Sequence, residues 1–133
     1  MSTELHQVDA PPIQADRPNA LSDPQDIVRY FRNALGLTED ELAQALGADQ
    51  RSIRRWSSDT KAAAPQRRHA QRIDDLRDLS ELLGETLPDP HIARWLRVRN
   101  RLLKGARPLD LLADGDYERV RDAAEAFVDG DPL

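Results

Sequence analysis

Two short helical patterns joined at a glycine constrain the fold of this 133-residue chain more than any other feature. They occupy residues 37–58, with the sequence LTEDELAQALGADQRSIRRWSS. Thr38 and Glu41 have the spacing of a capping box, which predicts a helix that begins there and stops at Gly47. Asp49 can cap a second helix, because its side chain can accept a hydrogen bond from a backbone N–H of the first turn. The stretch therefore predicts two short helices joined by a tight turn.

The apolar residues of this stretch are spaced as a helix-turn-helix motif requires. Ala43 is small where the two helices would cross, and Gly47, four residues later, permits the bend. Ile53 and Trp56 share one face of the second helix, where they would fill the space between the helices. We therefore expect this second helix, running to about Ser58, to be a recognition helix of the kind that enters the major groove of DNA.

The other face of that helix is rich in arginine, although the chain has 24 acidic residues and only 19 basic ones. Arginine can bind guanine O6 and N7 with two hydrogen bonds, or it can hold phosphates. Arg51 and Arg54 are the predicted base readers, and Gln50 can pair with adenine. Because a single such unit binds weakly, we expect a homodimer on a two-fold operator in double-stranded DNA. The residues predicted to bind DNA are Gln50, Arg51, Ser52, Arg54, Arg55, Ser58 and Lys61, of which Arg55, Ser58 and Lys61 are assigned to phosphates.

The rest of the chain is also predicted to be helical, since no window alternates apolar and polar residues as a strand would. Aromatic residues make up only 5% of the chain, so the core must consist mostly of Leu, Ile, Val and Ala. The sequence therefore predicts an all-α fold. The further helices are expected over 23–36 with Asp23 as cap, over 66–83, from 89 to about 100, over 108–115, and after a cap at Asp116.

Composition and motifs exclude several classes of function. The chain has no cysteine, and His6, His69 and His91 are scattered without the spacing of metal ligands. It has no nucleophile elbow and no phosphate-binding glycine-rich loop. We therefore expect no enzyme activity, no metal and no cofactor. No apolar run approaches the roughly 18 residues of a membrane span, and the start lacks the pattern of a secretory signal, which favours a cytoplasmic protein without membrane contact.

Charge is distributed unevenly along the chain, although the formal net charge is -5. Residues 47–77 hold eight basic and four acidic residues, whereas residues 104–133 hold four basic and eight acidic ones. Such asymmetry indicates two surfaces for two kinds of partner.

The last third of the chain resembles the toxin-binding domain of the Xre/MbcA/ParS family of antitoxins. The resemblance rests on the segment WLRVRNRLLKGARPLDLLADGDYERV, residues 95–120, with its Gly-x-x-Pro-x-x-Leu-Leu turn, and on SIRRW in the helix-turn-helix. Together these features cover about residues 25–128. Lys104 and Ala106 depart from the family's pattern around the glycine. The matching residues are Trp95, Asn100, Leu103, Gly105, Pro108, Leu111, Leu112, Gly115 and Val120.

The resemblance implies a type II antitoxin that covers the active site of a RES- or ParT-type toxin acting on NAD, and that represses its own operon through the helix-turn-helix. The expected layout is a mobile tail at 1–22, a DNA-binding domain with a long connecting helix at 23–84, and a toxin-binding domain at 85–133. The acidic C-terminal segment would suit a cleft that binds the phosphates of NAD. The residues expected to contact the toxin are Trp95, Asn100, Lys104, Gly105, Arg107, Pro108, Leu111, Leu112, Asp114 and Phe127.

Other interpretations stay open at the level of sequence. Trp95 and Phe127 also fit a packed core, and a helix as short as 108–115 needs a partner surface or the long helix to bury both Leu111 and Leu112. The alternative function is a plain helix-turn-helix regulator whose extra helices dimerise or sense a ligand. The long helix carries an apolar side that fits either the core or a dimer seam, namely Leu76, Leu79 and Leu83.

Overall fold

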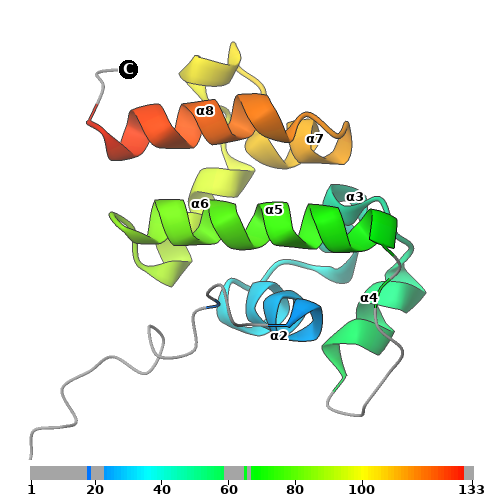
Figure 1. Cartoon of the computed structure of the whole chain (residues 1–133). Coiled ribbons are helices and arrows are strands. Elements are labelled where there is room, and N and C mark those ends of the chain that lie inside the picture. The colour runs from blue at the N-terminus through cyan, green and yellow to red at the C-terminus, as the bar shows by residue number, and fades with distance from the viewer. Residues whose placement is uncertain (1–17, 19–22, 59–64, 66, 131–133) are drawn as a thin grey trace, which may run out of the picture.

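The computed structural model describes residues 18, 23–58, 65 and 67–130, and every regular element in these ranges is a helix (Figure 1). The predicted all-α class is therefore confirmed. Within the same ranges, no helix is long and apolar enough to cross a membrane. The predicted tail, residues 1–22, lies outside the described residues except for Pro18. The elements are α2 (Pro24–Arg29), the π-helical segment η2 (Tyr30–Ala34), α3 (Glu39–Leu46), α4 (Gln50–Ser57), α5 (Arg67–Gly84), α6 (Asp89–Arg97), the 3-10 turn η3 (Arg101–Leu103), α7 (Pro108–Ala113) and α8 (Tyr117–Val128).

Hydrogen bonds at the caps confirm three of the predicted helix starts. Asp23 accepts a hydrogen bond from the backbone N–H three residues on, at 2.9 Å, before α2. Thr38 and Glu41 bond each other's backbone N–H at 2.9 and 3.0 Å, and Asp49 accepts at 2.7 Å in the first turn of α4. Gly47 ends α3 with φ at +66°, a conformation that glycine adopts without steric cost. Local side-chain chemistry thus fixes the bounds of both helices of the helix-turn-helix.

Two predicted helix termini differ in the structure. Asp116 does not cap α8, because its backbone (φ -97°, ψ 60°) is not the extended one from which a side chain reaches the first turn. The helix expected to reach about Asn100 ends at Arg97, since Val98 is already extended, with ψ at 155°. Asn100 starts a new turn instead, because its side chain caps η3.

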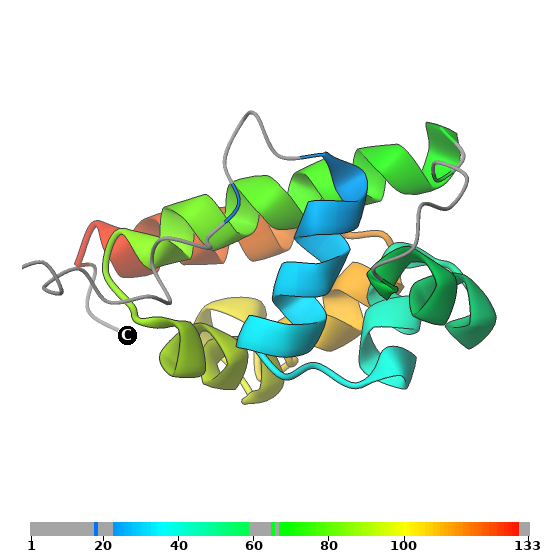
Figure 2. The ribbon, with the colours of Figure 1, turned by 90° about the horizontal axis from the view of Figure 1, so that it is seen from below.

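α5 runs through the middle of the molecule and contacts helices from both ends of the sequence (Figures 1 and 2). It packs against α2 and α3 from the N-terminal part, and against α6 and α8 from the C-terminal part. Its predicted apolar side is at most 3% exposed, which places these side chains in the core of a single chain rather than in a dimer seam. They are Ile73, Leu76, Leu79 and Leu83.

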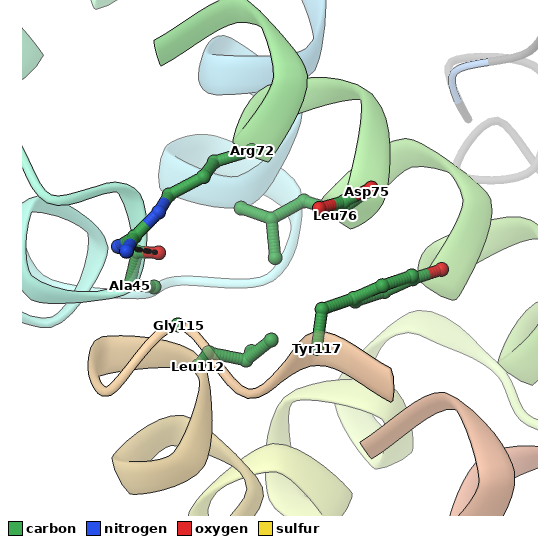
Figure 3. Close-up of a pocket in the computed structure, with 7 residues that line it drawn as sticks. All are labelled: Ala45, Arg72, Asp75, Leu76, Leu112, Gly115 and Tyr117. Carbon is green, nitrogen blue, oxygen red and sulfur yellow. Dashed lines mark hydrogen bonds between the residues drawn. The ribbon is translucent and has the colours of Figure 1, made fainter. Parts of the chain in front are cut away.

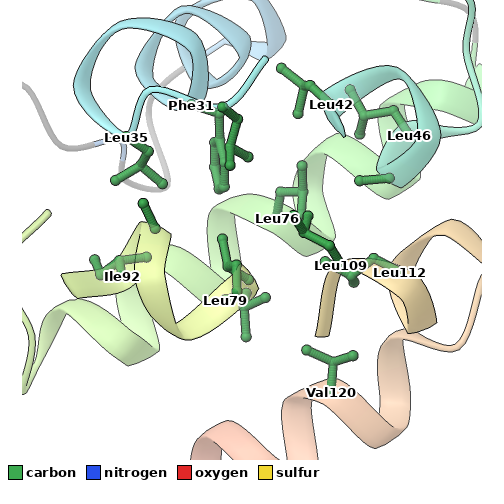
Figure 4. Packing of buried hydrophobic residues seen from close by; sticks show 14 of the residues in the cluster. Phe31, Leu35, Leu42, Leu46, Leu76, Leu79, Ile92, Leu109, Leu112 and Val120 are labelled. Atoms are coloured by element: carbon green, nitrogen blue, oxygen red, sulfur yellow. The ribbon is translucent and has the colours of Figure 1, made fainter. Parts of the chain in front are cut away.

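The C-terminal helices complete the same core (Figure 4). Leu111 and Leu112 are both buried although α7 has only six residues, because α7 contacts α3, α6 and α8. Neither leucine therefore needs a partner protein to cover it. The division into DNA-binding and toxin-binding domains at residue 84 stays a prediction, in a chain whose hydrophobic cluster continues across that residue.

A buried hydrogen bond joins the N-terminal part to α6. The hydroxyl of Tyr30 donates to Oδ1 of Asp89 at 2.6 Å, and Asp89 is fully buried at the first position of α6. A carboxylate away from water is tolerated only where hydrogen bonds replace its hydration. This bond therefore fixes the start of α6 against η2.

We predict that Tyr30→Phe lowers the free energy of unfolding by about 1–3 kcal/mol, because a buried carboxylate loses a donor. Tyr117→Phe is the matched control. It also removes a buried tyrosine hydroxyl, but one that has no hydrogen-bond partner among the described residues. That variant should be neutral or slightly more stable. Urea denaturation measures both effects, and equal losses in the two variants would contradict the role assigned to the Tyr30–Asp89 bond.

Candidate DNA-binding and partner-binding surfaces

α4 has the two faces that its sequence predicts. Ile53 and Trp56 are buried, against the core shared with α2 and α3. Arg51, Arg54 and Arg55 are exposed on the other side of the helix. The structure thus brings the predicted base readers together on one solvent-facing side of α4, and their binding to DNA stays a prediction.

Arg54 is held by a residue that the sequence analysis did not select. Its Nε and Nη2 donate to the two carboxylate oxygens of Glu39 at 3.3 and 3.1 Å. Glu39 is the first residue of α3, and its carboxylate also lies 4.0 Å from Nη2 of Arg32. The hydrogen bond from Arg54 holds the pKa of Glu39 below its ordinary value, so this carboxylate is charged at neutral pH.

The acidic first turn of α3 reaches a second predicted DNA-binding residue as well. Asp40 accepts hydrogen bonds from Gln44 at 2.9 Å and from Gln50 at 3.3 Å. Arg51, by contrast, has no hydrogen bond or ion pair within the described part of the chain. The run EDE at residues 39–41 was visible in the sequence, but only the packing of α3 on α4 places two of its carboxylates beside the recognition helix.

The remaining predicted DNA-binding residues lie at the two ends of α4. The backbone N–H of Ser52 donates to the capping carboxylate of Asp49, and Arg55 donates to the Ser52 hydroxyl at 3.4 Å. Ser58 is half-buried, and its carbonyl oxygen accepts from Arg29 at 3.1 Å. Lys61 lies outside the described residues.

A groove lies on the C-terminal part of the molecule, between α6 and the end of α8. Its volume is about 370 Å³. The rings of Trp95 and Phe127, both predicted to contact a toxin, lie 6.4 Å apart in it. We call it the α6–α8 groove, and it is lined by Leu87, His91, Arg94, Trp95, Val98 and Phe127.

Two exposed apolar side chains lie on the C-terminal part of the molecule, and one of them lines this groove. Val98 is 42% exposed and Leu102 is 38% exposed, and they are the two large exposed hydrophobic residues in the described ranges. Leu102 lines a second hollow of about 230 Å³, together with Ala123 and Ala126 on α8. Exposed apolar surface concentrated at one place is typical of a site that binds another protein. Neither Val98 nor Leu102 was predicted from the sequence. Val98 stands between two arginines, and Leu102 lies between Arg101 and the buried Leu103.

The other predicted toxin-contacting residues divide by burial. Lys104, Arg107 and Asp114 are exposed, and Gly105 is half-buried. Arg107 pairs with Asp110 at 2.8 Å, within the first turn of α7. Four more are buried, and their contact with a toxin stays a prediction, namely Asn100, Pro108, Leu111 and Leu112.

The loop that departs from the family's pattern has a strained backbone. Asn100 is buried, and its side chain accepts from the N–H of Leu102 at 2.8 Å while its own N–H donates to the carbonyl of Ala106. Lys104 has φ at +57°, which costs a non-glycine residue roughly 1–2 kcal/mol, and Gly105 follows at +86°. The side-chain and backbone hydrogen bonds of Asn100 hold this turn between α6 and α7 in place.

Arg72 of α5 connects the helix-turn-helix to the turn between α7 and α8 (Figure 3). Its guanidinium lies beside Gly47 and Gly115, and a Cβ at either glycine would come within about 3 Å of it. Its Nη1 also donates to the carbonyl of Ala45 at 3.5 Å. Ala45, Arg72 and Gly115 border a cavity of only about 30 Å³, which is large enough for one water but not for a ligand. Tyr117 borders it too, and burial raises the pKa of its hydroxyl to about 12.

Comparison with known proteins decides the family. The chain is 38% identical over 118 residues to the probable mycobacterial cidal antitoxin Rv3188 of Mycobacterium tuberculosis, covering 89% of this chain and 96% of that protein. It is 36% identical over 96 residues to the mycobacterial cidal antitoxin MbcA of Mycobacterium tuberculosis and of Mycobacterium bovis, covering 72% of this chain and 83% of MbcA. The chain belongs to the mycobacterial cidal antitoxin family. No protein-family model matches it.

A solved structure agrees with the sequence relatives of this antitoxin family. The fold matches a chain in the crystal structure of the M. tuberculosis MbcT–MbcA toxin–antitoxin complex with a TM-score of 0.66 and 33% sequence identity. The match covers 87% of this chain and all of that chain. The predicted resemblance is thus confirmed over most of the chain.

An ion pair ties the two parts of this family member together. Glu41, in the first turn of α3, accepts hydrogen bonds from Nε and Nη2 of Arg97 on α6, at 3.1 and 2.9 Å. Nη2 of Arg97 also donates to the carbonyl of Gly36. The hydrogen bonds from Arg97, with those from Thr38, hold the pKa of Glu41 below its ordinary value of 4.5, although its partial burial acts in the opposite direction.

We predict that Glu41→Gln lowers stability at pH 7 and that the difference from the wild type shrinks in acid. A depressed pKa stabilises the fold fully above pH 4.5, and this contribution is lost as the pH falls through the lower pKa of the folded state. Urea denaturation at pH 7 and pH 3 measures it. Glu85→Gln is the control, on an exposed carboxylate without an ion pair among the described residues. A pH-independent difference would contradict the ionic contribution.

Proposed function

We propose that this chain is the antitoxin of a type II toxin–antitoxin system, which binds its cognate toxin and neutralises it by covering the toxin's active site. The observation that carries the proposal is the 36–38% identity to proteins named as antitoxins, over 83–96% of their length. The match to an antitoxin chain seen in complex with its toxin supports it further. We propose that the toxin is of the RES or ParT type and acts on NAD, as the Xre/MbcA/ParS resemblance implies.

The α6–α8 groove is the surface best suited to the toxin. It combines an apolar floor with two polar rim residues, His91 and the cationic Arg94, and neither has an ion pair among the described residues. The exposed carboxylates Asp114 and Asp129 lie further along the same C-terminal part and would be attracted to a cleft that binds phosphates. Desolvated apolar anchors supply most of the binding energy in such interfaces, whereas charges at the rim steer association.

We predict that Val98→Glu weakens toxin binding at least tenfold, which corresponds to about 1.4 kcal/mol, because it places an unpaired charge in an apolar contact. Gln44→Glu adds the same charge on the exposed side of α3 and should leave toxin binding unchanged. The dissociation constant of each variant for the purified toxin is measured by calorimetry. Wild-type affinity in Val98→Glu would place the toxin elsewhere, and absence of any complex with the wild type would remove the antitoxin function.

We propose further that the chain represses its own operon by placing α4 in the major groove of operator DNA, as a homodimer on a two-fold site. The support is geometric: α4 is the second helix of a helix-turn-helix, with its apolar side buried and its arginines exposed. A plain transcriptional regulator would use the same face of α4. The two functions separate at the toxin, because only an antitoxin loses toxin binding and neutralisation when the α6–α8 groove is altered.

We predict that Arg54→Ala lowers discrimination at one base pair of the operator by about 1–3 kcal/mol. Arg55→Ala should instead weaken binding to all sequences and reduce the slope of log affinity against log salt concentration by about one. A base reader contributes discrimination, while a phosphate contact contributes affinity alone. Fluorescence anisotropy with operator variants at several salt concentrations measures both. Arg121→Ala, on α8, is the control. If neither arginine of α4 matters, the groove assignment is wrong.

A further inference from the structure

We infer that Glu39 is a positioning residue for base recognition: it holds Arg54 side-on so that the free outer edge of the guanidinium faces a guanine. This inference rests on the proposed DNA-binding function and adds a residue to it. Glu39 belongs to the first helix of the motif and would not contact a base itself. Figures 1 and 2 show α3 and α4 next to each other at one end of α5, which is the arrangement that brings Glu39 to Arg54.

The geometry of the pair leaves the DNA-reading edge of Arg54 unused. A guanidinium has five N–H groups, and Glu39 accepts from one on Nε and one on Nη2. The other N–H of Nη2 and the two of Nη1 stay available, and they form an end-on fork that can donate to guanine O6 and N7. The Arg54 side chain is 64% exposed, so protein does not cover this fork.

Glu39 is itself fixed in place. Its side chain is only 25% exposed, and its carboxylate lies between Arg54 and Arg32. Arg32 is anchored in turn, because its Nη1 donates to the carbonyl of Leu37 at 2.6 Å. The N-terminus of α3 adds favourable interaction with a negative charge at its first residue. A carboxylate flanked by an anchored arginine and a helix N-terminus can orient a flexible arginine, whereas a mobile one cannot.

Preorganisation is the physical reason for this arrangement. A free arginine side chain loses much of its rotamer freedom when it is ordered, which opposes binding. An arginine already ordered by Glu39 has less freedom to lose on binding DNA, and its fork has one preferred direction. The competing interpretation is that Glu39 merely masks Arg54 and repels phosphates. The two interpretations predict opposite effects on discrimination between bases.

The test compares Glu39→Gln with Asp40→Asn, which removes the same charge from the same turn but contacts Gln50 and not Arg54, so that only the base pair read by Arg54 is compared. The base pair read by Arg54 is first identified as the one whose replacement no longer matters in Arg54→Ala. At that base pair, Glu39→Gln should lose roughly tenfold of the discrimination, within the range of about 5- to 150-fold that a good bidentate pair gives. Asp40→Asn should keep the full discrimination there. In an Arg54→Ala background, Glu39→Gln should have no further effect on it.

Thermal unfolding of each variant shows that the fold is kept, and anisotropy at fixed salt gives the affinities. If Glu39→Gln keeps the discrimination and raises affinity for every sequence as much as Asp40→Asn does, Glu39 only repels DNA and the inference is overturned. If Arg54→Ala leaves every base preference intact, Arg54 reads no base and the inference about Glu39 is wrong, although the chain still binds its operator. If the wild type shows no sequence preference at all, the proposed DNA-binding function fails first.

Discussion

Burial of the apolar side of α5 is the interaction on which the rest of the structure depends. This 18-residue helix is longer than any other in the described ranges, and it contacts α2, α3, α6 and α8. None of these helices is long enough to be stable alone in water, since isolated helices under about 12–15 residues are marginal. Their stability comes from packing on α5 and on one another. The helix-turn-helix and the C-terminal helices therefore share one core.

Electrostatic contacts then set how the two surfaces lie on that core. Glu41 bonds Arg97 across α3 and α6, and Arg72 lies between two turns that are far apart in sequence. Each contact is partly exposed, so each adds only modest stability. Their effect is on geometry: they fix the C-terminal surface relative to the helix-turn-helix. The bond between Tyr30 and Asp89 does the same from inside the core.

Local patterns made most of the fold predictable. The capping residues Thr38 and Asp49 determined where α3 and α4 begin, because a cap acts within one turn of its own position. The burial of Ile53 and Trp56 followed from helical periodicity. The predictions that were wrong concern two helix termini, where the backbone conformation rather than the residue type decided the outcome. Asp116 has capping chemistry but lies in a turn whose backbone does not present it.

The candidate sites were predictable only as far as one helix reaches. The arginines of α4 share a face by periodicity alone, but their carboxylate partners come from α3, and no pattern within one helix identifies them. The α6–α8 groove is likewise made by residues some thirty to forty positions apart, from Leu87 to Phe127. Val98 gains its significance only from the end of α8 beside it. Sequence therefore predicted which helices carry function, and packing determines which of their side chains lie together.

The first turn of α3 shows why the two surfaces of this antitoxin-family protein are best considered together. Glu39 bonds Arg54 of α4 and Glu41 bonds Arg97 of α6, and the two glutamates stand within one turn of a capped helix. A capped turn is rigid, because its backbone N–H groups are already satisfied. The position of Arg54 relative to Arg97 of α6 is thus fixed by one turn of α3 and by the two ion pairs that this turn makes. DNA and a bound toxin would meet a body of fixed geometry.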